Sequence, residues 1–172
     1  MENLEKNNFN KFDKITNSDN LEDSFYEIKK ISVLFDNLFE KNHSNNLDKV
    51  IDMSYNFKKE FSNGSIEYKR SLISYNNSDK INKLIRQIYW RIYEGVVTEN
   101  VQLCYYIIGL EDSGIASTIS SDELIKSLNI INNAIYDTYI QSSHLFMKNT
   151  YNNSIILVIK LWIEKENKIE YF

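Results

Sequence analysis

Residues 64–108 have the sequence GSIEYKRSLISYNNSDKINKLIRQIYWRIYEGVVTENVQLCYYII, which predicts a strand, a helix and a second strand. Side chains of alternating character over 66–72 are typical of a strand with two different faces. Over 78–95, apolar residues recur every three or four positions between a Ser-Asp start and a glycine, as in a helix with one buried face. The continuous apolar run at 101–108 predicts a buried strand.

Two further helices are expected ahead of this stretch. Apolar residues at spacings of three and four over 21–38 predict one helix, and a similar pattern over 47–57 suggests a second. Together they form an expected N-terminal helical hairpin over residues 21–62. Residues 1–20 are Asn-rich and charged, with isolated apolar residues, and we expect them to be a mobile leader.

The chain beyond residue 108 predicts a sheet that continues with one more helix. Ser120 and Glu123 have the spacing of a capping box, which marks a helix start. The expected elements are a hairpin turn at 112–114, a strand at 115–119, a helix at 120–139, a polar loop at 141–153, a buried central strand at 155–163 and the start of a strand at 169–172. The order after Gly64 is therefore β-α-β-β-α-β. We expect an α+β fold, with a mixed sheet and packed helices over residues 63–172, as one unit with the hairpin.

Composition excludes several classes of protein. The chain has 172 residues, a formal net charge of -4 and one cysteine. It therefore lacks the broad basic surface of most nucleic-acid-binding domains, and it has neither an intramolecular disulfide nor a multi-cysteine zinc site. Cys104 lies in an apolar run and is expected to be buried, while His43 and His144 are interpreted as surface residues. The polar N-terminus and the absence of a long apolar stretch favour the cytoplasm.

The motifs that bind GTP are absent from these 172 residues. A GxxxxGK[ST] loop needs a lysine after its second glycine, and only Gly109 and Gly114 have the spacing, with Ile115 in the lysine position. No Asn-Lys-x-Asp sequence for guanine occurs either. We therefore expect no cofactor in this chain.

Four short motifs occur in a characteristic order. They are GSIEYK at 64–69, QIYWRIYEG at 87–95, YIIGLEDSG at 106–114 and SSDEL at 120–124. Together they resemble the region ahead of the GTPase domain in the GTP-binding protein 1 and 2 family, relatives of elongation factor 1-alpha and elongation factor Tu. The resemblance covers roughly residues 61–135 and, more weakly, 155–163.

This resemblance implies an accessory N-terminal domain of a translation-associated GTP-binding protein with a role in RNA quality control. GTP and Mg²⁺ would then belong to a GTPase domain, in cis or in trans, and this chain would be a truncated or split product. Ribosome or RNA are the implied partners. Three features depart from the family pattern: the longer segment 96–104, Thr118 in place of a glycine, and the Asn-rich loop after Tyr139.

A second, looser resemblance leads to an enzymatic alternative. Glu67-Tyr-Lys69 ahead of a helix, followed by a buried strand and an acidic turn, is similar to the AlbA-like domains of Schlafen-type proteins, some of which cleave RNA. This resemblance implies a metal-dependent ribonuclease or an RNA-binding domain, with Glu67, Glu111 and Asp112 as metal ligands and Lys69 as a charge stabiliser. If the domain is not a nuclease, we expect Glu111 and Asp112 to be turn residues and Glu67 to face solvent.

Basic residues near the central helix form a candidate RNA or ribosome contact. Trp90 beside Arg91 could stack on a base or bind a phosphate, although packing of Trp90 at the edge of the core with Arg91 in solvent is the expected arrangement. The candidate contact residues are Lys69, Arg70, Lys80, Lys83, Arg86 and Arg91.

Besides the accessory domain and the ribonuclease, a third possible function is a stand-alone protein-interaction module.

Overall fold

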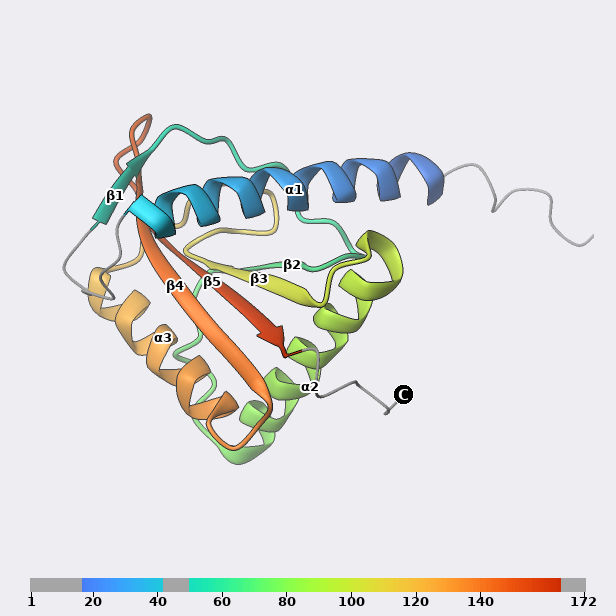
Figure 1. Ribbon diagram of the computed structural model, residues 1–172. Helices are drawn as coiled ribbons and strands as arrows, with labels where there is room; N and C mark the ends of the chain where they lie inside the picture. The colour runs from blue at the N-terminus through green and yellow to red at the C-terminus, as the bar shows by residue number, and fades with distance from the viewer. Residues whose placement is uncertain (1–16, 42–49, 165–172) are drawn as a thin grey trace, which may run out of the picture.

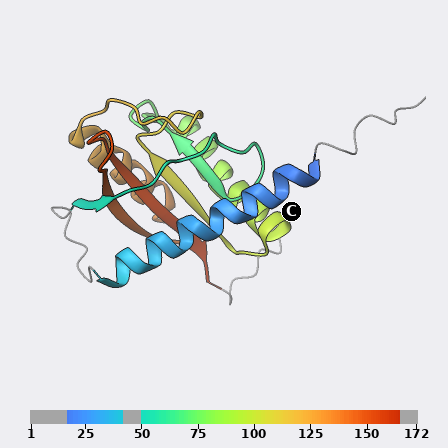
Figure 2. The same ribbon diagram turned by 90° about the horizontal axis from the view of Figure 1, so that it is seen from above.

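The computed structural model describes residues 17–41 and 50–164, which fold into three layers. Its elements in chain order are α1 (Asn17–Lys41), β1 (Val50–Met53), β2 (Ile66–Lys69), α2 (Ser78–Glu94), the π-helical turn η1 (Gly95–Glu99), β3 (Leu103–Ile108), α3 (Ser121–Ile135), β4 (Ile140–Asn149) and β5 (Ile155–Ile163). The strands form a sheet in the middle layer. α1 crosses one face of this sheet, and α2 and α3 cover the other (Figures 1 and 2).

The sheet is mixed, as predicted. Its strand order is β1-β4-β5-β3-β2. β2 and β3 run parallel and are connected by α2, while β5 pairs antiparallel with both β3 and β4. β1 adds a parallel edge beside β4. β5, the last strand of the described chain, therefore lies at the centre of the sheet, as the apolar run at 155–163 predicts.

Both faces of β3 are buried, which explains why this strand is apolar at every position. Cys104, Tyr106 and Ile108 pack in the core that contains α2 and α3. Tyr105 and Ile107 pack in the core that contains α1. Cys104 is buried, as expected, and burial raises the pKa of its thiol.

The two helices on one face begin with side-chain caps. The side chain of Asn77 accepts a hydrogen bond from the backbone N–H of Lys80 at 3.0 Å, which starts α2. The predicted capping box of Ser120 and Glu123 is present at the start of α3, with hydrogen bonds in both directions. The α+β class with helices packed on the sheet is confirmed. Within the described ranges, no helix is long and apolar enough to cross a membrane.

The prediction of a second helix in the N-terminal hairpin is wrong. Residues 50–53 form β1, and the chain from there to residue 65 contains no helix. Asp52 is exposed and Met53 is buried in the core with α1, so the local period is that of a strand held by pairing with β4. Residues 42–49 of the expected hairpin lie outside the described residues. Residues 17–20 of the expected leader belong to α1, and residues 1–16 lie outside the described residues.

The prediction of a strand at 115–119 is also wrong. Both edges of β3 are already paired, with β2 and β5, so no partner is free beside it. The segment makes only an isolated bridge between Leu110 and Ala116.

The expected loop at 141–153 is a strand over most of its length. Residues 140–149 form β4, which pairs with β1 on one side and β5 on the other. The many polar residues of this segment give no strand pattern in the sequence, but Leu145, Phe146 and Met147 are buried. His144 is half-buried on β4, where burial lowers its pKa, and His43 lies outside the described residues. The order after Gly64 is thus β-α-β-α-β-β, and 169–172 are not described.

Candidate functional site

A group of charged and polar side chains is enclosed between β2 and α2, and we name it the buried ion-pair cluster. Its members are Glu60, Glu67, Lys69, Gln87 and Arg91. Glu67 and Lys69 are two positions apart on β2, so they share the sheet face that α2 covers. Gln87 and Arg91 are one turn apart on α2 and lie on the same side of the helix. The strand and helix periods therefore bring these residues together.

Arg91 lies at the centre of the cluster. Its Nε and Nη2 atoms are 2.6 and 2.5 Å from Oε2 of Glu67, and Nη2 is also 2.6 Å from Oε1 of Glu60. Nη1 donates a hydrogen bond to the carbonyl oxygen of Gly64 at 3.1 Å. The side chains of Arg91 and Glu67 are only 5% and 3% exposed. A guanidinium with acceptors on every side is held in one orientation.

The second carboxylate oxygen of Glu67 is occupied as well. Oε1 accepts a hydrogen bond from Nε2 of Gln87 at 2.6 Å and lies 2.5 Å from Nζ of Lys69. A buried charge without a partner costs several kcal/mol, in order of magnitude about 3–5, and here two acids face two bases. The cluster thus connects β2, α2 and the segment ahead of β2 into one unit.

Glu60 is the member of the cluster whose charge changes near neutral pH. Burial and the neighbouring carboxylate of Glu67 raise the pKa of Glu60 to about 7, against the opposing effects of the Tyr68 N–H and the Arg91 guanidinium. For Lys69, burial acts to lower the pKa, but the hydrogen bond and charge of Glu67 outweigh it, so the pKa is raised. Lys69 therefore stays charged while Glu60 titrates.

Two motif glycines close the loops around the cluster. A Cβ atom at Gly95, just after α2, would lie 2.8 Å from the carbonyl oxygen of Leu103. Gly114 has a φ of +82°, and a Cβ atom there would lie 2.5 Å from the carbonyl oxygen of Phe57. Neither position has room for a side chain, and the second also needs a left-handed backbone. These motif residues therefore serve the fold.

Three carboxylates outside the candidates that the sequence indicates are well shielded from water: Glu27 and Glu99 are buried, and Glu60 is half-buried. Glu99 on η1 accepts hydrogen bonds from the backbone N–H and the hydroxyl group of Ser65. The weak signal for Glu99 is its place between the apolar residues Val97 and Val101. Glu60 lies in a run of charged residues and has no such signal.

The structure brings together two of the four candidate nuclease residues. Glu67 and Lys69 form an ion pair, whereas Glu111 lies in the exposed loop after β3. The carbonyl oxygen of Asp112 accepts a hydrogen bond from the backbone N–H of Glu60 at 2.7 Å. Among the residues that the structure describes, no three His, Cys, Asp or Glu side chains are grouped so that they could hold a metal ion. The expectation that Glu67 faces solvent in the non-enzymatic case is wrong, because its carboxylate is buried and paired.

The candidate RNA contacts fall into two groups. Lys69 and Arg91 belong to the buried ion-pair cluster, so the expectation of a solvated Arg91 is wrong. The arrangement of the Trp-Arg pair is reversed, because Trp90 is 40% exposed. The other four cations are exposed: Arg70, Lys80, Lys83 and Arg86.

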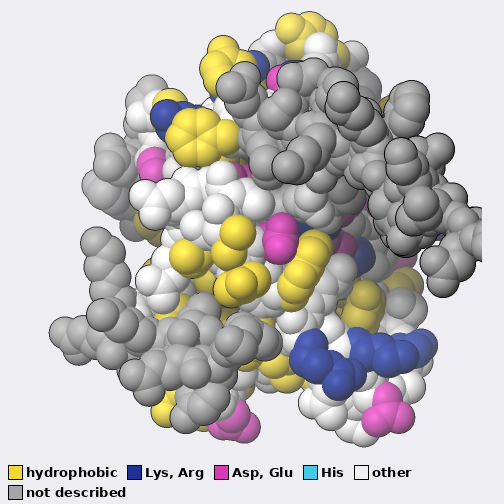
Figure 3. Space-filling view, turned by 90° about the vertical axis from the view of Figure 1, so that its right-hand side faces the viewer, with side chains coloured by type: hydrophobic (Ala, Val, Ile, Leu, Met, Phe, Trp, Pro, Cys, Tyr) yellow, Lys and Arg dark blue, Asp and Glu magenta, His cyan; other side chains and the backbone are white. Residues whose placement is uncertain are grey.

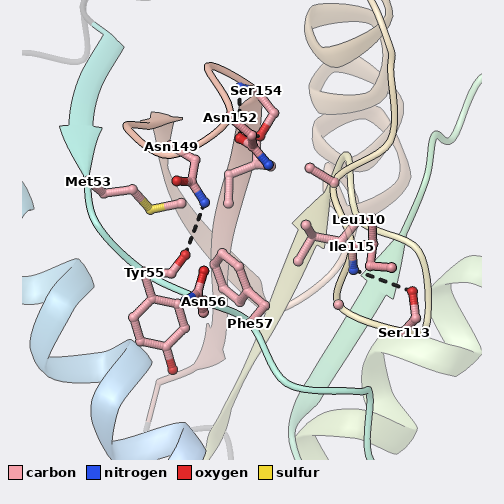
Figure 4. Close-up of a pocket in the computed structure, with 13 residues that line it drawn as sticks. Met53, Tyr55, Asn56, Phe57, Leu110, Ser113, Ile115, Asn149, Asn152 and Ser154 are labelled. Atoms are coloured by element: carbon pink, nitrogen blue, oxygen red, sulfur yellow. Dashed lines mark hydrogen bonds between the residues drawn. The ribbon is translucent and has the colours of Figure 1, made fainter.

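A separate cavity of about 290 Å³ lies between the segment after β1, the loop after β3 and the turn between β4 and β5. Figure 4 shows Asn149, Asn152 and Ser154 on one side of it and Leu110 and Ile115 on another. Asn149 donates a hydrogen bond to the backbone of the first segment at 3.0 Å. Among the described residues that line the cavity, none has a charged side chain.

The sequence matches no known family model, and no curated protein sequence matches it significantly. Function must therefore be inferred from the residues and their geometry.

Proposed function

We propose that this domain is the accessory, non-catalytic domain of a translation-associated GTP-binding protein of the elongation-factor-like family. The observation that supports this proposal is the buried ion pair between Glu67 and Arg91, which joins two of the four motifs that resemble that family. The motifs are thus residues that hold one architecture together. A protein that shares them in this order is expected to share the architecture.

The other two motifs support the same interpretation. Gly114 of the third motif packs against the backbone at Phe57, and Asp112 pairs with the backbone of Glu60. Ser120 and Glu123 of the fourth motif cap α3. Each motif therefore has a local structural explanation, and none of them needs catalysis to account for it.

GTP binding and hydrolysis are assigned to a separate GTPase domain, in cis or in trans, which would also bind the Mg²⁺ ion. The one glycine pair with P-loop spacing lies in the loop between β3 and α3, and Ile115, in the lysine position, is 68% exposed. A hydrophobic side chain there cannot neutralise a phosphate. The implied setting is the ribosome in the cytoplasm.

The proposal is tested by the size and companions of the native protein. An antibody raised against residues 50–164 would be used to blot a cell extract and to purify the native product with its partners. A product several-fold heavier than 20.4 kDa that contains a GTPase domain is the expected result. A product of 20.4 kDa that co-purifies with a separate GTPase also agrees with the proposal. A product of that size with no associated GTPase contradicts it and favours a stand-alone interaction module.

The ribonuclease alternative is less favoured, because both oxygens of the Glu67 carboxylate are engaged by Arg91, Gln87 and Lys69. A Mn²⁺-dependent RNA cleavage assay with the wild-type chain and the Glu67→Gln variant separates the two functions. Cleavage that the substitution abolishes, while circular dichroism shows an intact fold, would support the nuclease and contradict the accessory role.

A further inference from the structure

One side of α2 and η1 carries a continuous row of exposed side chains, and we name it the α2 outer stripe. It consists of Lys83, Arg86, Trp90, Tyr93 and Val97, spaced alternately by three and four residues. This spacing places them on one side of a helix. Figure 3 shows a face of the molecule on which Lys and Arg side chains gather low on the face, with exposed hydrophobic side chains above them. The stripe thus has a basic half and an aromatic half.

The cations of the basic half, Lys83 and Arg86, are not engaged in ion pairs of the described chain. Lys80, one turn earlier, is exposed, and its Nζ donates to the carbonyl oxygen of Ser74 at 2.7 Å. The single acidic residue of the first turn is Asp79. The positive end of the helix dipole lies at the first turn, which contains Lys80.

The aromatic half presents rings to solvent. Trp90 is 40% exposed and Tyr93 is 42% exposed. The guanidinium of Arg91 lies 4.8 Å from the centre of the Trp90 ring, and the buried ion-pair cluster fixes that guanidinium. The indole is therefore held over a rigid support, which reduces the entropy lost when a ligand stacks on it.

We propose that the α2 outer stripe binds single-stranded RNA, with phosphates at Lys83 and Arg86 and a base stacked on Trp90. Arg86 and Trp90 are four residues apart, roughly 6 Å along the helix axis, so the two contacts suit one short strand. Cations beside exposed aromatic rings are the usual chemistry of single-strand binding. The net charge of -4 makes the affinity modest and strongly dependent on salt. This inference depends on the surface of α2 and not on the GTPase proposal.

The test uses the full 172-residue chain and a fluorescein-labelled uridine dodecamer, with fluorescence anisotropy at several salt concentrations. Wild-type protein should bind the dodecamer, and a blunt RNA duplex of the same length should bind more weakly because its bases are already stacked. The Lys83→Ser/Arg86→Ser double variant should weaken binding about tenfold or more and reduce the salt slope by about 1.4. Trp90→Ala should weaken binding about 5- to 100-fold and leave the salt slope unchanged.

The matched control is Lys126→Ser, which removes one exposed cation from α3 instead. It should change the affinity less than about twofold, because the charge lies off the stripe. Circular dichroism of every variant verifies the fold. Absent binding by the wild type, or an equal loss in the control and the double variant, would overturn the proposal. Absent binding would leave the stripe as a surface for a protein partner, and equal affinity for the duplex would also contradict the stacking contact.

Discussion

The two sides of α2 both carry arginine, but the arginine on one side is buried and paired, and the arginine on the other side is exposed. On the inner side, Arg91 contacts two carboxylates and a backbone carbonyl and is nearly inaccessible to water. On the outer side, Arg86 is exposed and in no salt bridge of the described chain. The two arginines are five residues apart, which corresponds to roughly 140° around the helix axis. Residue type therefore does not decide whether a cation supports the fold or remains available for a ligand; position around the helix does.

Removal of the inner arginine should have the largest effect on stability. Arg91→Met leaves Glu67 and Glu60 buried without their main partner, and it should lower the free energy of unfolding by about 3–5 kcal/mol. Urea unfolding followed by circular dichroism measures this loss. Arg91→Lys keeps the charge but loses the paired hydrogen bonds, so an intermediate loss is expected.

Arg86→Met is the matched control on the outer side and should change the free energy of unfolding by less than about 0.5 kcal/mol. Equal losses in the two methionine variants would show that burial of Arg91 does not distinguish the two sides of α2.

The apolar part of the inner side should be almost as sensitive. Ile88 is completely buried between α2 and the sheet, so Ile88→Ala should cost about 3 kcal/mol through lost contacts and a cavity. The same truncation at exposed Lys83 should cost less than about 0.5 kcal/mol. Thermal and urea unfolding of both variants provide the comparison, and a loss below about 1 kcal/mol at Ile88 would contradict the packing described here.

Glu60 should give a smaller effect that depends on pH. Its pKa of about 7 in the folded protein lies above its ordinary value of 4.5, so the folded state binds this proton more tightly than the unfolded state. The stabilisation from this group is complete below pH 4.5 and is lost as the pH rises to about 7. Glu60→Gln cannot titrate. Its free energy of unfolding should therefore fall less than that of the wild type between pH 5 and pH 8, by on the order of 1 kcal/mol.

This difference is measured by urea unfolding of both proteins at the two pH values. The lowered pKa of His144 acts in the opposite direction, since stability rises as the pH increases toward the ordinary value of 6.5. Both proteins contain His144, so its contribution cancels in the comparison. Parallel pH profiles would rule out a role of Glu60 in the pH dependence.

The smallest effect on stability is expected for the outer stripe. The Lys83→Ser/Arg86→Ser double variant should unfold within about 1 kcal/mol of the wild type, because surface substitutions cost about 0.5 kcal/mol each at most. Urea unfolding verifies this, alongside the RNA-binding assay. A clear destabilisation would mean that the outer side also contributes to the fold.

The parts of the fold that could be predicted are those specified by local pattern. The stripe from Ile81 to Ile92 and the capping box at Ser120 predict α2 and α3 because both signals are contained within a few turns. The sequence does not predict β1 because its partner, β4, is distant in the chain. It does not predict β4 because polar residues dominate the first half of that strand, although its partner β5 follows it directly. The pairing of Val50 with Phe146 has no local signature.

The candidate site divides in the same way. The motifs around Glu67 and Arg91 are visible in the sequence, but their ion pair depends on the crossing of α2 over β2. The sequence alone therefore predicts Arg91 in solvent and Trp90 at the edge of the core, the reverse of the observed arrangement. The apolar stripe of α2 does not show which of its neighbours, Trp90 or Arg91, points toward the sheet. That choice depends on the buried carboxylate of Glu67, which needs a charged partner.

The central position of β5 has a consequence for synthesis of the chain. β3 and β4 do not pair with each other, and each pairs with β5. Until residues 155–163 leave the ribosome, the nascent chain can hold only two separate pieces of sheet, β1 with β4 and β2 with β3, each with an uncovered edge. The sheet of this domain therefore cannot be completed before β5 has been synthesised. Until then, the unpaired edges are open to pairing with other chains.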